Sequence, residues 1–111
     1  MDDANILIKT GKDGSITIIC EGSLDLTNSS DFHDKLKTAS QTAENVIVDI
    51  SKVDFIDTQI VQDLANAAVT LLKRNKRLKT IVNHTAYPLR VLTVTSLQSI
   101  MDIEIVGRGS A

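Results

Sequence analysis

The residues best placed to do chemistry are Asp57 and Thr58, which come directly before an amphipathic segment. Apolar residues recur there at helical spacing, at Ile60, Val61, Leu64, Ala65, Ala67, Ala68, Leu71 and Leu72. This spacing predicts a helix that begins at a carboxylate and a hydroxyl. A helix start has unpaired backbone N–H groups and about half a positive charge, so it favours an acceptor side chain or a phosphate. Two interpretations stay open: an ordinary N-cap, or a hydroxyl that carries a phosphate.

The segments before this helix must position it. The apolar run over residues 46–50, broken only by Asp49, predicts a central strand with helices above and below it. Residues 6–10 and 15–20 predict an antiparallel hairpin around a turn that contains the favoured Asp-Gly pair. Cys20 lies on the apolar face of that hairpin, which favours a buried, inert thiol.

The remaining elements follow from polar loops and apolar spacing. Residues 21–30 form the most polar loop and lead into a predicted helix over residues 31–39, capped among Asn28, Ser29 and Ser30. The clustered side chains of this loop are either capping groups or recognition groups. Five cations in residues 73–79 predict a solvated helix end. We expect a strand over 78–82, a helix from Pro88 to Thr95, a last strand over 103–106 and a frayed tail.

The predicted order is β-β-α-β-α-β-α-β, an α/β fold with a mixed, mostly parallel sheet and an N-terminal β-hairpin at one side. The length of 111 residues predicts one domain over residues 1–111. In such sheets ligands and partners gather at the carboxyl ends of the strands. The 22–30 loop and the Asp57-Thr58 helix start both fall there.

Composition excludes several classes of function. A net charge of −2 and 3% aromatic residues argue against a nucleic-acid partner. One cysteine and the isolated His33 and His84 provide neither a metal site nor a nucleophile motif, and we expect no metal and no cofactor. The acidic N-terminus and the lack of an apolar run of about 18 residues argue against a signal peptide and against direct membrane insertion. We therefore expect a cytoplasmic protein.

The order of elements resembles the STAS domain, the family of bacterial anti-sigma factor antagonists and stressosome subunits. Two segments carry the resemblance, Glu21-Gly22-Ser23-Leu24-Asp25 and the stretch from Val48 to Thr58, whose part from Val53 onward is the more specific. The resemblance implies a non-catalytic partner-switching protein that binds a serine/threonine kinase, which is also the anti-sigma factor. That kinase phosphorylates the hydroxyl residue after the aspartate, here Thr58, and a phosphatase removes the phosphate. No enzyme motif, such as a paired acid and base or a phosphate-binding glycine loop, competes with this interpretation.

The surface expected to bind the partner contains polar residues of the loop and of the helix start: Asp25, Thr27, Asn28, Asp57, Gln59 and Gln62. Gln59-Ile60-Val61 follows Thr58, where many antagonists have a small residue and a glycine. This bulkier pattern looks more like the stressosome branch, whose members form scaffolds with other STAS proteins and sequester a switch kinase. A further alternative is an accessory subunit of a lipid or anion transporter, because STAS-like domains also accompany such machinery.

Overall fold

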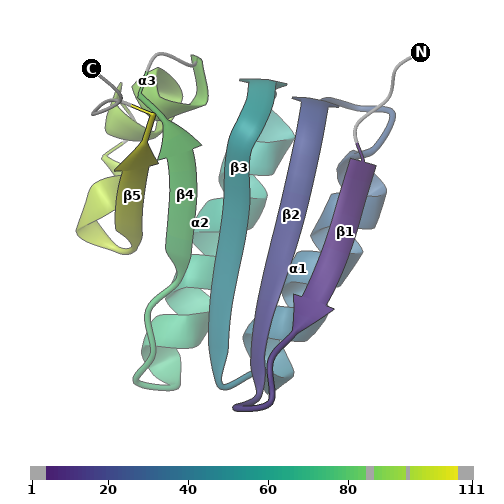
Figure 1. Cartoon of the computed structure of the whole chain (residues 1–111). Helices are drawn as coiled ribbons and strands as arrows, with labels where there is room; N and C mark the ends of the chain where they lie inside the picture. The colour runs from purple at the N-terminus through teal and green to yellow at the C-terminus, as the bar shows by residue number, and fades with distance from the viewer. Residues whose placement is uncertain (1–4, 85–86, 95, 108–111) are drawn as a thin grey trace.

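The sheet is the frame on which the other elements are arranged. In the computed structural model, which describes residues 5–84, 87–94 and 96–107, it contains five strands. They are β1 (Asn5–Thr10), β2 (Ser15–Leu24), β3 (Asn45–Ile56), β4 (Lys79–Asn83) and β5 (Asp102–Val106). The spatial order is the sequence order, with β1 antiparallel to β2 and the other neighbours parallel (Figure 1). This confirms the predicted mixed, mostly parallel sheet with a hairpin at its edge.

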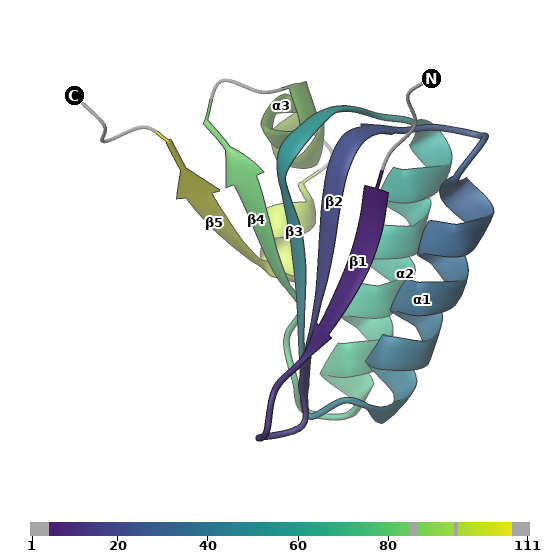
Figure 2. The same cartoon turned by 45° about the vertical axis from the view of Figure 1, so that its right-hand side comes forward.

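Three helices connect the parallel strands within the described residues. They are α1 (Ser29–Thr42), α2 (Thr58–Lys73) and α3 (Tyr87–Val94), and a short 3-10 turn, η1 (Leu97–Ser99), precedes β5. The predicted order of strands and helices is confirmed, whereas η1 was not predicted. Figure 2 shows α1 and α2 side by side on one face of the sheet.

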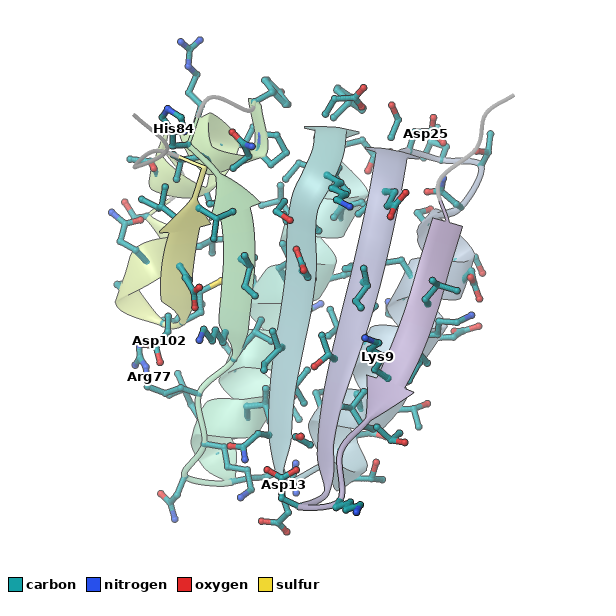
Figure 3. The ribbon with its side chains drawn as sticks, in the orientation of Figure 1. Lys9, Asp13, Asp25, Arg77, His84 and Asp102 are labelled. Carbon is teal, nitrogen blue, oxygen red and sulfur yellow. The ribbon has the colours of Figure 1, made fainter. Side chains whose placement is uncertain are left out.

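The prediction of helices on both faces of the central strand was wrong. Burial alternates along β3: Val46, Val48 and Ile50 are buried against the helices, while Ile47 and Asp49 are half-exposed on the other face. That other face, on which Lys9 is labelled in Figure 3, carries no helix of the described residues. The core is therefore a single layer between the sheet and its helices, filled mainly by aliphatic side chains and by Phe32.

The second strand is longer than predicted. The sequence reads as a polar loop from Glu21 onward, but β2 continues to Leu24 beside β3. Its register with β3 shifts twice in this stretch, and Gly22 has a φ of 94°, which suits glycine. The extension brings the end of β2 level with the end of β3, because Leu24 pairs with Ile56.

The cationic run after α2 ends the helix and fixes neighbouring segments. Asn75 has a φ of 62°, and the Lys76 N–H donates to Leu71 O at 2.8 Å, the bond of a Schellman ending. Arg74 donates to the backbone oxygen of Ser40 at 2.8 Å, and Arg77 pairs with Asp102 at 2.9 Å at the amino end of β5 (Figure 3). The exposed Arg77–Asp102 ion pair contributes little stability.

Some predicted segments lie outside the described residues: the first four residues of the acidic N-terminus, positions 85, 86 and 95 around the third helix, and the tail from 108 to 111. Pro88 is in the first turn of α3, as predicted. None of the helices in the described part of the chain is long and apolar enough to span a membrane.

Candidate functional site

The candidate site is built on the junction between β3 and α2. The carboxyl ends of β2 and β3 meet at one edge of the sheet, at the top of Figure 1. The backbone N–H of Asp57 donates to Leu24 O at 3.1 Å, which ties the start of α2 to the last residue of β2. Residues 22–30 and the helix start were predicted to lie close together, and this hydrogen bond joins them directly.

Asp57 is the N-cap of α2. Its backbone is extended, and its Oδ1 atom accepts hydrogen bonds from the N–H groups of Gln59 at 2.9 Å and Ile60 at 3.3 Å. This bonding satisfies two of the donors that a helix start leaves unpaired. Asp57 therefore caps the helix, and the hydroxyl of Thr58 takes no part in capping.

Thr58 is the first residue of α2 and is exposed to solvent. Its hydroxyl makes no hydrogen bond with another described residue, in contrast to the neighbouring Asp57 carboxylate. The helix dipole favours negative charge at this position, while Asp57 opposes a second negative charge beside it. The hydroxyl of Thr58 is therefore accessible to solvent and free of hydrogen bonds to other described residues.

The loop residues Asp25, Thr27 and Asn28 bond chiefly to one another. Asp25 Oδ1 accepts from Thr27 Oγ1 at 2.6 Å and from the Thr27 N–H at 3.0 Å. These two bonds from Thr27 hold the pKa of the Asp25 carboxyl below its usual range. Asn28 Oδ1 accepts from the Asp25 N–H at 3.0 Å, and its Nδ2 donates to Ser23 O at 2.9 Å.

Asn28 is also the N-cap of α1 by position, within the predicted range of residues, but its side chain makes no capping hydrogen bond. Its amide instead holds the turn together, so the expected side-chain cap was wrong for Asn28. The loop is therefore a turn held by internal hydrogen bonds, and it directly follows Leu24, which is bonded to Asp57. Leu26 projects from it with 80% of its surface exposed.

Gln59 and Gln62 extend the site along the first turns of α2. Gln59 Nε2 donates to Asp63 Oδ1 at 3.2 Å, and Gln62 Nε2 donates to Asn66 Oδ1 at 3.4 Å. Both glutamines are exposed. Their amides point along α2, one turn toward its carboxyl end, so they continue the polar surface away from the loop.

Two aromatic residues at the same edge of the sheet were missed from the sequence. Phe55, near the end of β3, stacks on Tyr87 at the start of α3, with ring centroids 5.6 Å apart and planes 10° apart. Phe55 is 41% exposed and Tyr87 47% exposed. Exposed stacked rings are typical of interface anchors. The available signal was that Phe55 is a large apolar residue two positions before Asp57.

Metal and thiol chemistry have little support. No group of three His, Cys, Asp or Glu side chains converges among the described residues. Cys20 is buried, and its burial, with smaller contributions from Asp49 and Asp31, raises the pKa of its thiol to about 12. His84 is exposed beyond β4, and its backbone N–H donates to Val106 O at 3.0 Å.

Comparison with solved structures shows the same fold in anti-sigma factor antagonists. The antagonist from Mycobacterium paratuberculosis superposes with a TM-score of 0.77 at 17% identity, over 92% of this chain and 86% of that one. A putative antagonist from Thermotoga maritima superposes with a TM-score of 0.72 at 17% identity, over 93% of this chain and 87% of that one. The phosphorylated form of the Bacillus cell fate determinant SpoIIAA superposes with a TM-score of 0.70 at 16% identity, over 94% of this chain and 93% of that one.

The sequence comparison assigns the family directly. No curated protein matches the chain significantly in sequence. A family model described as Mlab, STAS domain, matches residues 9–106, which span all but the two ends of the 111-residue chain. The chain belongs to the STAS domain family.

Proposed function

We propose that the protein is a partner-switching signalling protein of the anti-sigma factor antagonist type, regulated by phosphorylation at Thr58. Its partner would be a serine/threonine kinase that acts as anti-sigma factor or switch kinase. The observation that carries this proposal is the exposed, unbonded hydroxyl of Thr58 at the start of α2, beside a neighbour that already caps the helix. The protein itself is proposed to be non-catalytic and to act in the cytoplasm.

The proposed docking surface has a polar part and an apolar part. The polar part contains Asp25, Thr27, Asn28, Asp57, Gln59 and Gln62 around Thr58. The apolar part contains Leu26, Phe55 and Tyr87, which are exposed large apolar residues. Aromatic anchors surrounded by polar groups are typical of protein interfaces. The structurally similar SpoIIAA, which exists in unphosphorylated and phosphorylated forms, supports a phosphate-dependent mechanism.

The proposed switch needs no change of fold. A phosphate adds about −1.5 to −2 charges to Thr58 next to the Asp57 carboxylate. The helix dipole tolerates this charge in the free protein, but a partner packed over Thr58 would have to remove its hydration. A loss of about 3 kcal/mol would weaken binding roughly a hundredfold. A phosphatase would restore binding by removing the phosphate, and related STAS proteins could share the same complexes.

The test is the affinity of the kinase for matched variants, measured by isothermal titration calorimetry. Thr58→Ala should bind like the unmodified protein, and Thr58→Asp should bind at least tenfold more weakly. Thr38→Asp adds the same charge at an exposed position of α1 and should bind normally. Equal affinities of Thr58→Ala and Thr58→Asp would reject the charge switch. Tyr87→Ala should weaken binding if the stacked rings anchor the partner.

A second candidate is an accessory subunit of a transporter. The observation that favours it is the matched family model, whose description names Mlab. Affinity purification of the tagged protein from its own cells separates the two candidates. Co-purification with a membrane ATPase, with no phosphate on Thr58, would favour the transporter subunit, and co-purification with a serine/threonine kinase would favour the switch.

A further inference from the structure

The outer edge of β1 is apolar on both faces of the sheet. β1 lies at one end of the sheet, and among the described strands it pairs only with β2 (Figure 1). Leu7 and Ile8 are neighbours whose side chains point to opposite faces, and they are 60% and 45% exposed. An exposed apolar edge strand is a template for pairing with another strand. No residue of the surface proposed to bind the kinase lies on β1.

On the helix side, β1 borders an open groove of about 320 Å³. Ile8 and Ile16 line it from the hairpin, and Asp34 and Lys35 are among the residues that line it from α1. Ile18, which lies opposite Ile8 on β2, is fully buried, whereas Ile8 is not. The helices therefore cover β2 but leave space beside β1 for another element.

The opposite edge of the sheet is protected by charge. On β5, Asp102 pairs with Arg77 at 2.9 Å and Glu104 pairs with Lys79 at 2.6 Å. Charged side chains oppose the pairing of an edge strand with another chain, because pairing would remove part of their hydration. β1 carries only one charged residue, Lys9. Pairing of β1 with β5 of another copy, which would propagate into an open filament, is therefore disfavoured.

The sequence of β1 is complementary to itself in one antiparallel register. Opposite residues of adjacent strands share a face, so a register that places Leu7 opposite Leu7 of a second copy also places Ile6 opposite Ile8. Lys9 then lies opposite Asn5, and no two like charges meet. A shift of this register by one or two residues in either direction sets one of the three apolar residues against Asn5 or Lys9.

We propose that β1 is a self-association surface, which pairs antiparallel with β1 of a second copy of this chain around Leu7. The two sheets join into one continuous sheet, and Ile6 of each copy extends the apolar lining of the groove beside Ile8 of the other. A two-fold axis relates the copies, so the contact closes after two chains. Because the residues around Thr58 are not part of this contact, the dimer carries two of the surfaces proposed to bind the kinase.

An engineered disulfide tests the register. Opposite residues of an antiparallel pair have Cα atoms about 4.5 to 5.5 Å apart, a separation that suits a disulfide. Leu7→Cys should therefore form a covalent dimer under mild oxidation, seen as a doubled mass without reductant. Lys9→Cys is the matched control, because its two copies would lie four residues apart along the strands, about 13 Å, and it should not cross-link. Cys20 is buried and does not compete.

Analytical ultracentrifugation of the full chain measures the association itself. The mass should rise from 12.1 kDa toward twice that value as the concentration increases from micromolar to millimolar. Leu7→Lys places like charges opposite each other and should weaken dimerisation at least tenfold. Val69→Lys, which changes an exposed apolar residue of α2, should dimerise like the parent protein.

Three results would each overturn the proposal. One is a parent protein that stays monomeric up to millimolar concentration. Another is a Val69→Lys variant that dimerises as weakly as Leu7→Lys. The third is a Lys9→Cys variant that cross-links as readily as Leu7→Cys, and this comparison still decides if Leu7→Lys fails to fold.

Discussion

Because Asp57 caps α2, its replacement by alanine should lower the stability of the fold. In Asp57→Ala the helix loses two side-chain hydrogen bonds, to the N–H groups of Gln59 and Ile60. Loss of an N-cap costs about 1 kcal/mol, and loss of a negative charge at a helix start costs about 0.5 kcal/mol more. We therefore expect the free energy of unfolding to fall by about 1.5 kcal/mol. For a chain of this length the melting temperature should fall by about 6 °C.

Urea denaturation followed by far-UV circular dichroism measures the effect. Asp57→Asn keeps an acceptor oxygen and loses only the charge, so it should cost about 0.5 kcal/mol. Asp34→Ala removes an exposed carboxylate of α1 that makes no described bond, and it should stay within about 0.5 kcal/mol of the parent protein. The reasoning fails if Asp57→Ala is no more destabilising than Asp34→Ala, or if Asp57→Asn is as destabilising as Asp57→Ala.

Three further predictions follow from the same geometry. The bonds from Thr27 lower the pKa of Asp25 from 3.8, so this carboxylate stabilises the fold above pH 3.8. The stabilisation is lost as the pH falls through the lower pKa that Asp25 has in the folded state. An NMR titration of Thr27→Val should show the pKa of Asp25 rising toward 3.8. Since burial raises the pKa of Cys20 to about 12, iodoacetamide should leave this thiol unmodified in the folded protein and alkylate it in urea. At Asn75, whose φ is 62°, the glycine variant should exceed the alanine variant in unfolding free energy by about 1 kcal/mol.

The sequence predicted the elements well because their signals are local. The helical spacing after Thr58, the Asp-Gly turn of the hairpin and the single proline each depend on neighbouring residues. The prediction of helices on both faces of the strand at residues 46–50 was wrong for a physical reason. Ile47 is apolar but only half-buried, so a strand with one buried face resembled a strand with two. The end of β2 was missed because Gly22 and its polar neighbours are poor strand formers, and pairing with β3 overrides that preference.

The contacts that give the site its character are not local, and so they could not be predicted. Phe55 stacks on Tyr87, which is 32 positions away, and the His33–Asp63 bond spans 30 positions. The choice of Asp57 over Thr58 as the cap depends on a backbone conformation that both residue types can adopt. The candidate residues were correctly placed at one edge of the sheet, while their bonding partners required the structure.

The measurement that tests the central claim most directly is intact mass followed by peptide mapping of the protein isolated from its own cells. One half of each sample is treated with phosphatase before analysis. We expect a phosphatase-sensitive phosphate on Thr58 and none on the exposed Thr38. If no phosphate is found on Thr58 under any growth or stress condition, the switch account is contradicted. Thr58 would then be only the first residue of the helix that Asp57 caps.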